Sequence, residues 1–205
     1  MQFLSRSSFE TLVPSLSLWF LVAGYLVMMA FLIIQELLRR TPETKTLQRG
    51  SFEKGSMLLI GVTLGVGLWV PLIVDILGIA LFPISIFEGS VALAVMLIGL
   101  GLRAWAAVTL GGYYTRTLTT TKNHTVVTTG PYSWVRHPAY LGVILLWLGF
   151  GVLSSSLVVA LVFPVMFVAV YLYRISVEER MLVKVFGDTY VQYQRRTCKL
   201  IPFVY

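Results

Sequence analysis

Long apolar segments alternate with polar segments along this chain, and the alternation predicts the helices of a membrane protein. A helix rises about 1.5 Å per residue, so roughly 20 apolar residues cross the ~30 Å hydrocarbon layer of a bilayer. The pattern therefore predicts an all-α integral membrane protein. We expect five transmembrane helices, at residues 15–38, 55–74, 90–110, 140–153 and 157–173.

The last two apolar segments are separated only by three serines, at residues 154–156. So short a connection predicts an antiparallel helical hairpin, although its first arm is short for a full crossing. Polar segments lie on both sides of this hairpin, at 111–135 and from residue 174 onward. In the second of them we expect a further helix through Gln194.

The composition of the chain is that of a membrane protein. Of the 205 residues, 57% are hydrophobic and 12% are charged, whereas about a quarter of the residues in a soluble domain are charged. The single cysteine excludes an intramolecular disulfide and a cysteine-cluster metal site. His124 and His137 lack carboxylate partners at ligand spacing, so we expect no bound metal.

The basic residues are distributed unequally between the two sides of the predicted bundle. Fifteen of the 16 Lys and Arg residues fall on one side, and the formal net charge is +7. The positive-inside rule then places the N-terminus outside and the C-terminus in the cytoplasm. Arg103, near the end of the third apolar segment, is expected to snorkel to this interface. Because topology explains the positive charge, nucleic acid is not an expected partner.

Residues 130–142 concentrate the candidate chemistry. A Gly-Pro turn opens the segment, and Pro138 stands where a helix can begin, because its missing N–H costs nothing at the first helical position. Arg136 and His137 should therefore lie at the mouth of a membrane helix, whose unpaired N–H groups favour an anion. The alternative is that both are ordinary interfacial residues.

Three motifs stand in the C-terminal half of the chain. The first contains Arg136-His-Pro-Ala-Tyr140-Leu-Gly142, the second is Arg174-x-x-x-Glu178-Glu179, and the third is Phe186-Gly187-x-x-Tyr190-x-x-Tyr193. Together they resemble the isoprenylcysteine carboxyl methyltransferase family over roughly residues 113–205. That resemblance implies an integral membrane enzyme that methylates the carboxylate of a C-terminal prenylcysteine with S-adenosylmethionine. Phospholipid methyltransferases share much of the pattern, and sterol reductases share a looser version.

The resemblance also implies site residues. The family positions that contact S-adenosylmethionine match His124, Thr125, Val126, Val127, Tyr132, His137, Pro138, Ala139, Tyr140 and Glu178. The family position that matches Arg174 serves the substrate, so Arg174 is the candidate catalytic residue. The chain then divides into an N-terminal three-helix membrane region, 1–110, and a catalytic region, 111–205, which holds the cofactor-binding loop, the hairpin and the C-terminal helix.

Physical chemistry favours the same roles. Arg174 and Glu178 are four residues apart and share one helix face. Glu178 can accept hydrogen bonds from the ammonium or ribose of the cofactor, which leaves the planar fork of Arg174 for a substrate carboxylate. The alternative is a surface ion pair of little consequence. Glu179 points about 100° away and is expected to be structural or solvated. The third motif, with Phe186, Gly187, Tyr190 and Tyr193, is expected to fold the C-terminal helix back over the site.

Three other functions are open at this point. A phospholipid amine methyltransferase needs a base, whereas a carboxylate with a pKa of about 3.5 is already ionised at pH 7 and can attack the methyl group directly in line. The others are a sterol-reductase-like NADPH-dependent enzyme and a non-enzymatic membrane scaffold. The expected partners are the bilayer and a lipid-modified or lipid-like substrate, with the active site of this multi-pass protein facing the cytoplasm.

Overall fold

The computed structural model describes residues 6–38, 51–79, 82–111 and 126–201. Within these residues the predicted all-α fold is confirmed, and the only isolated bridge joins Val135 to Cys198. The helices are α1 (Arg6–Leu38), α2 (Ser51–Ile76), α3 (Ile86–Leu110), the 3-10 helix η2 (Gly130–Ser133), α4 (Pro138–Leu153), α5 (Leu157–Phe186) and α6 (Asp188–Arg196).

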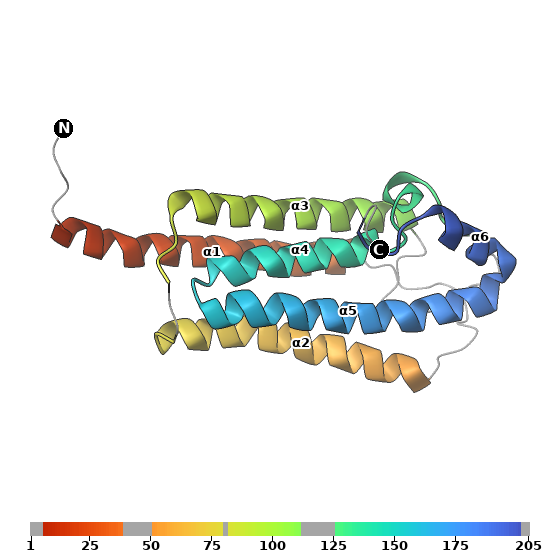
Figure 1. Ribbon diagram of the computed structural model, residues 1–205, viewed down its shortest axis with the longest axis horizontal. Helices are drawn as coiled ribbons and strands as arrows, with labels where there is room; N and C mark the ends of the chain where they lie inside the picture. Colours follow the sequence, from red (N-terminus) through yellow and green to blue (C-terminus); the bar gives the residue numbers. More distant parts are fainter. Residues whose placement is uncertain (1–5, 39–50, 80–81, 112–125, 202–205) are drawn as a thin grey trace.

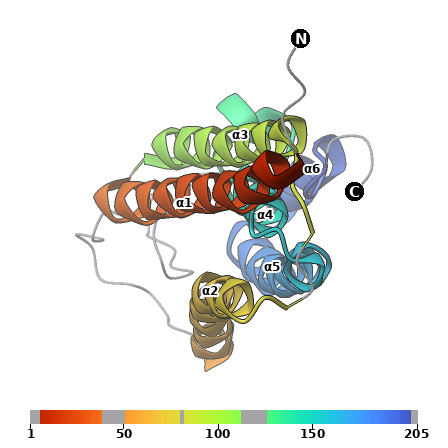
Figure 2. The ribbon, with the colours of Figure 1, turned by 90° about the vertical axis from the view of Figure 1, so that its left-hand side faces the viewer.

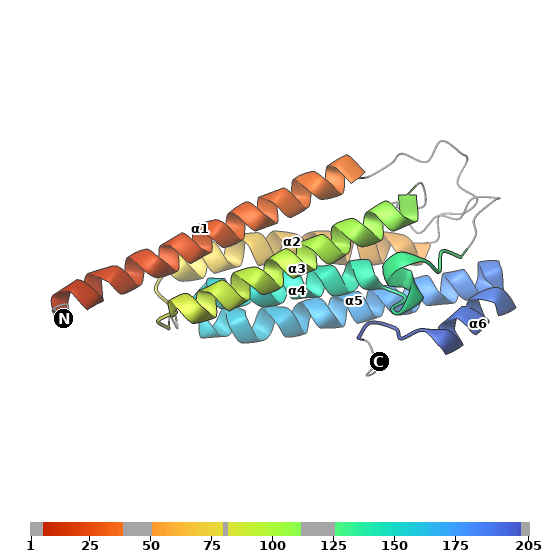
Figure 3. The same ribbon diagram turned by 90° about the horizontal axis from the view of Figure 1, so that it is seen from above.

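The helices α1 to α5 form an elongated bundle with α4 at its centre (Figure 1). α4 packs between α3 and α5, α1 contacts both α3 and α4, and α2 lies along α5. In the view along the bundle, α1 and α3 lie on one side of α4, whereas α5 and α2 lie on its other side (Figure 2). Seen from above, the first turns of α1 extend beyond the other helices, whereas α6 lies at the opposite end (Figure 3).

Glycines let α4 approach α3 closely. A Cβ atom on Gly99 would lie 2.5 Å from the carbonyl oxygen of Gly142, and one on Gly142 would lie 2.6 Å from the carbonyl oxygen of Gly99. A Cβ atom on Gly149 would meet the carbonyl oxygen of Ala92 at 2.4 Å. These distances leave no room for side chains, so the two helix backbones pack directly on each other, as small residues allow in membrane helix pairs.

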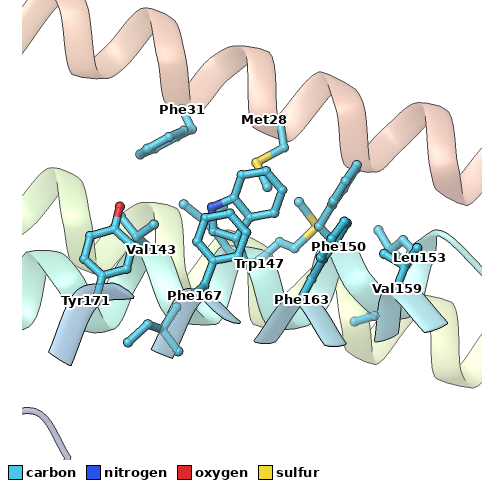
Figure 4. Close-up of a cluster of buried hydrophobic side chains, with 14 of the residues drawn as sticks. Met28, Phe31, Val143, Trp147, Phe150, Leu153, Val159, Phe163, Phe167 and Tyr171 are labelled. Carbon is cyan, nitrogen blue, oxygen red and sulfur yellow. The ribbon is translucent and has the colours of Figure 1, made fainter. Parts of the chain in front are cut away.

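Aromatic side chains fill the space between α4, α1 and α5 (Figure 4). Trp147 is 1% exposed and stacks on Phe167 of α5, with ring centroids 4.1 Å apart. Phe150 meets Trp147 edge to face, and Met28 of α1 lies against the same cluster. Because lipid is as apolar as these side chains, the cluster stabilises the bundle through close packing rather than removal from water.

Four of the described helices contain segments long and apolar enough to cross a membrane: Leu16–Leu38, Leu58–Ile76, Ile86–Leu110 and Leu157–Phe186. They correspond to four of the five predicted spans. α4, predicted as a span at 140–153, has 16 residues and is about 24 Å long, less than the ~30 Å hydrocarbon layer. The fifth crossing therefore stays a prediction.

The hairpin of α4 and α5 is confirmed, and its serine turn is buried. Ser154, Ser155 and Ser156 are at most 3% exposed. The connection between α2 and α3 covers this turn. The Phe82 amide donates to the carbonyl oxygen of Ser155 at 2.8 Å, and the Ser156 hydroxyl donates to the carbonyl oxygen of Ile79 at 3.2 Å. The C-terminal end of the short helix α4 is thus held by hydrogen bonds to the connection between α2 and α3.

Several helix boundaries differ from the prediction: α1 begins at Arg6 rather than residue 15, and α2 begins at Ser51 rather than residue 55. α3 begins earlier because Ser85 and Glu88 form a capping box, in which each side chain accepts a hydrogen bond from the backbone amide of the other. The helix predicted to run through Gln194 is broken at Gly187, whose φ of 54° favours glycine and separates α5 from α6. α5 has 30 residues, about 45 Å, and extends beyond the start of α4 (Figure 1).

Candidate active site

The candidate site lies at the end of the bundle where α4 begins and α5 projects past it (Figure 1). Gly130, with a φ of 58° in the left-handed region, opens the short helix η2. The chain then passes through the bridge at Val135 to His137, and Pro138 occupies the first turn of α4, as predicted. This path presents Arg136 and His137 at the helix mouth.

The C-terminal segment folds back onto this loop, as predicted. The Arg136 amide donates to the carbonyl oxygen of Cys198 at 2.9 Å, and the Tyr193 hydroxyl on α6 donates to the carbonyl oxygen of Tyr132 at 2.7 Å. Burial raises the pKa of the Tyr193 phenol to about 12, so this group remains a donor at neutral pH. Burial also raises the pKa of Tyr190, its neighbour on α6.

Arg136 and Glu179 form the first of two polar clusters at this end. Nε of Arg136 donates to Oε1 of Glu179 at 2.7 Å, and Nε2 of His137 lies 3.2 Å from the same oxygen. Nη1 of Arg136 donates to the carbonyl oxygens of Gln194 and Thr197, where a cation is favourable because α6 ends there. The cluster joins α5, α6 and the loop before α4. Glu179 is therefore structural, one of the two predicted outcomes.

The second cluster centres on the hydroxyl group of Tyr140. This hydroxyl donates to Oε2 of Glu178 at 2.6 Å and accepts from Nε of Arg174, 3.5 Å away. Arg174 is only 4% exposed. The Tyr140 ring packs near His137 and Tyr171, with centroids 5.7 and 5.2 Å away. Arg174 and Glu178 thus share one face of α5, as their spacing predicts, and that face is turned toward α4.

The second cluster retains capacity to bind a ligand. A carboxylate offers about four acceptor positions, and the Tyr140 hydroxyl takes one position on Glu178. Glu178 can therefore accept further bonds from an ammonium or hydroxyl group. Arg174 offers the planar guanidinium that binds carboxylates with two parallel hydrogen bonds. The arrangement suits a zwitterionic ligand held beside a second, anionic group.

Six predicted site residues come together in space, namely His137, Pro138, Ala139 and Tyr140 at the start of α4 and Arg174 and Glu178 on α5. Tyr132 points elsewhere, because its hydroxyl lies 3.5 Å from the carbonyl oxygen of Ala106 in α3. Residues 126–127 are partly buried coil before η2, and residues 124–125 lie outside the described part of the chain. The cofactor and substrate roles of all these residues stay predictions.

Sequence reasoning missed two contacts. The sequence suggests His137 as a donor to a cofactor carboxylate, yet its Nε2 atom contacts Glu179, so a ligand contact would fall to Nδ1. The sequence signal for this contact was the rotation of about 100° between adjacent helical residues, which turns Glu179 toward a different neighbour from that of Glu178. The other missed contacts are those of the partly buried Arg103, which donates to Ala139 and Gln35. No sequence signal marks these partners, because they are 36 and 68 residues away.

Residues 92–184 match the model of the isoprenylcysteine carboxyl methyltransferase family. The protein-S-isoprenylcysteine O-methyltransferase of Schizosaccharomyces pombe is 34% identical over 125 residues, which are 60% of this chain and 52% of that protein. The protein of the same name from Saccharomyces cerevisiae is 33% identical over 135 residues, 60% and 56% of the two chains. The cobalt-zinc-cadmium resistance protein CzcN of Cupriavidus metallidurans is 33% identical over 145 residues, 67% and 63%.

These matches span between about half and two thirds of each curated relative. A solved structure of the eukaryotic intramembrane Ras methyltransferase ICMT has a similar fold, with a TM-score of 0.59 and 21% identity over 97% of this chain and 75% of that chain. The family match includes all of α4 together with Arg174 and Glu178, the residues that form the second cluster. The chain is therefore similar to the isoprenylcysteine carboxyl methyltransferase family over residues 92–184 and shares the fold of a solved member.

Proposed function

We propose that this protein transfers the methyl group of S-adenosylmethionine to a carboxylate on a lipid-like substrate, with the C-terminal prenylcysteine of a protein as the expected type. The match to the family model over residues 92–184 and the names of the two yeast relatives support the proposal. The observation that carries it is the Tyr140 cluster, in which one hydroxyl contacts both Glu178 and the buried Arg174.

The residues around the start of α4 fit the polar groups of the methyl donor. Glu178 has acceptor positions for its ammonium or ribose hydroxyls, and Nδ1 of His137 with the N-terminal field of α4 suits its carboxylate. When bound, the donor supplies an electrophilic methyl group on a sulfonium. The family resemblance supports further contacts from residues 124–127 and from Tyr132, Pro138, Ala139 and Tyr140.

Arg174 is the proposed ligand of the substrate carboxylate. The Arg174 side chain is only 4% exposed and is therefore shielded from water. A charge-assisted, two-pronged hydrogen bond is stronger in such a buried site than in water. A carboxylate with a pKa of about 3.5 is ionised at pH 7 and needs no general base. The task of the protein is then to hold the nucleophile in line with the methyl group and to exclude water.

The charge of the site favours a carboxylate over an amine. Glu179 pairs with Arg136 at 2.7 Å, so that cation is already neutralised within the first cluster. In the second cluster, Glu178 is assigned to the methyl donor, whereas the Arg174 guanidinium would attract a substrate carboxylate and repel an ammonium substrate. A phospholipid amine methyltransferase is therefore the less favoured alternative.

We also propose that the chain crosses the membrane five times with the site on the cytoplasmic side. The candidate site lies at the end of the bundle where α1, α3 and α5 end, and the sequence pattern assigns 15 of the 16 basic residues to that side. The positive-inside rule places such charge in the cytoplasm. The substrate would enter sideways from the inner leaflet, because moving a prenyl chain into water costs about 0.8 kcal/mol per CH₂ group.

Ligand-induced stabilisation tests the proposal on purified protein in lipid nanodiscs. S-adenosylhomocysteine at about 100 times its Kd should raise the free energy of unfolding by about 2.7 kcal/mol, and NADPH should leave it unchanged. Stabilisation by NADPH but not by S-adenosylhomocysteine would favour the reductase alternative. Stabilisation by neither nucleotide would favour the non-enzymatic membrane scaffold.

A further inference from the structure

Arg103 links three helices at the level of the site. From α3, its Nη1 atom donates to the carbonyl oxygen of Ala139 in α4 at 3.0 Å, and its Nη2 atom donates to Oε1 of Gln35 in α1 at 2.9 Å. Its guanidinium carbon lies 5.3 Å from the centre of the Phe31 ring, within cation–π range. One side chain therefore connects α1, α3 and α4.

The backbone of Arg103 is itself held against α4. A Cβ atom on Gly142 would lie 3.0 Å from both the Cβ and the backbone nitrogen of Arg103. Gly142 follows Ala139 by three residues, which is less than one helical turn. The arginine stem therefore starts at a fixed separation from the carbonyl group that it binds.

The Ala139 carbonyl group connects Arg103 to the candidate site. This carbonyl and the Tyr140 amide belong to one planar peptide unit. Holding the oxygen therefore holds the residue whose hydroxyl contacts Glu178 at 2.6 Å and Arg174 at 3.5 Å. Precision matters here, since a 1 Å misplacement can cost about a hundredfold in rate.

The partners of Arg103 also give α1 a role. A charged residue within a membrane helix is costly, and such residues usually serve function and pair with protein groups. One of these partners, Gln35, lies outside the family-matched residues 92–184. α1 is thereby tied, through two hydrogen bonds, to the first turn of α4.

We infer that Arg103 is a positioning residue: with Gln35 it fixes the peptide between Ala139 and Tyr140, so that the Tyr140 hydroxyl stays on Glu178. The effect of Arg103 on ligand affinity rests on the proposed function, whereas its effect on the order of α4 rests on the geometry alone. Two separate measurements test these two effects.

Hydrogen exchange of the ligand-free protein in nanodiscs tests the geometric part. Arg103→Met removes both Nη donors, Gln35→Leu removes only the tether to α1, and Thr63→Val is the control that removes a buried hydrogen bond within α2. We expect the Tyr140 and Leu141 amides to exchange about tenfold faster in Arg103→Met, by less in Gln35→Leu, and unchanged in the control. Unchanged exchange in Arg103→Met, or equal acceleration in all helices, overturns the inference.

A double-mutant cycle tests whether Arg103 acts through Tyr140. The Kd for S-adenosylhomocysteine is measured by calorimetry in wild type, Arg103→Met, Tyr140→Phe and the double variant. Arg103→Met should weaken binding about tenfold alone but less than about twofold in the Tyr140→Phe background. Arg103→Lys, which keeps the charge but has a single donor nitrogen, should restore part of the affinity and replaces Arg103→Met if that variant does not fold. Additive effects contradict the inference. No binding by wild type refutes the proposed function instead, and hydrogen exchange then decides the inference.

Discussion

At the residue scale, two adjacent glutamates serve different neighbours because consecutive helical residues point about 100° apart. Glu178 accepts from Tyr140 in the second cluster, whereas Glu179 accepts from Arg136 in the first. The first cluster contacts the end of α6, and the second includes Arg174. The proposed ligand-binding residue and the structural one thus lie side by side on one turn of α5.

This separation predicts different losses for the two charged residues of the second cluster. Glu178→Ala should weaken S-adenosylhomocysteine binding, because a donor on the ligand loses its acceptor. Arg174→Ala should leave that affinity nearly intact while kcat/KM falls ten- to a hundredfold, the effect of losing about 1.5–3 kcal/mol from a charge-assisted contact. Arg174→Lys should recover only part. Calorimetry and a methyl-transfer assay on the same preparations measure both quantities.

Ser176→Ala is the matched control for these variants. Ser176 is exposed on α5 between the two residues, and its hydroxyl donates only locally, to the carbonyl oxygen of Tyr173. We expect it to leave binding and turnover unchanged. Equal loss of cofactor affinity in Glu178→Ala and Arg174→Ala would mean that the cluster is one structural unit, and the division of roles would be wrong.

At the element scale, α4 determines the fold because it is short, central and in backbone contact with α3. The contact at Gly99 and Gly142 leaves no space for a methyl group. The serine turn closes one end of α4, and the candidate site occupies the other. A change in the spacing of α3 and α4 would therefore shift the start of α4, where the site residues begin.

Gly99→Ala should destabilise the protein by about 1–3 kcal/mol, since the new Cβ would lie 2.5 Å from the carbonyl oxygen of Gly142 and the helices must move apart. Gly101→Ala is the control on the same helix, because among the described residues no atom lies within 4 Å of its Cβ position. This control should be neutral or slightly stabilising, as alanine favours helices. Thermal unfolding in nanodiscs measures both, and equal melting temperatures would contradict the packing account.

The sequence predicted the elements better than their contacts. Apolar runs located the helices, and the motif from Arg136 to Tyr140 located the start of α4, because both signals are local. The partner of Glu178 was not predictable from spacing, since Tyr140 is 38 residues away and meets it only through packing of α4 on α5. The early start of α3 was readable, because Ser85 and Glu88 have capping-box spacing.

At the scale of the whole molecule, polarity is concentrated at one end of the bundle. Both polar clusters and the returning C-terminal segment lie there, beyond the start of α4 (Figure 1). The opposite end holds the buried serine turn and the connection between α2 and α3. This asymmetry is what the proposed topology requires, with cofactor supplied from water and substrate from lipid.

The topology predicts that single cysteines at the two ends label from opposite faces of oriented vesicles. In a Cys198→Ser background, Arg195→Cys on α6 should react only from the cytoplasmic side and Pro83→Cys only from the outer side, because both positions are exposed. Pro83 serves better than the serine turn, which is at most 3% exposed. Labelling of both positions from one side would exclude the five-span arrangement.

Methyl transfer to a carboxylate is best tested by the chemical stability of the methylated product. Purified protein in nanodiscs is incubated with S-adenosylmethionine labelled in its methyl group and with a prenylcysteine carrying a free carboxylate. We expect transfer of label into a base-labile methyl ester that releases volatile methanol, and little transfer by Arg174→Ala. Label that stays bound to an amine after base treatment, or no enzyme-dependent transfer at all to this carboxylate, would contradict this expectation.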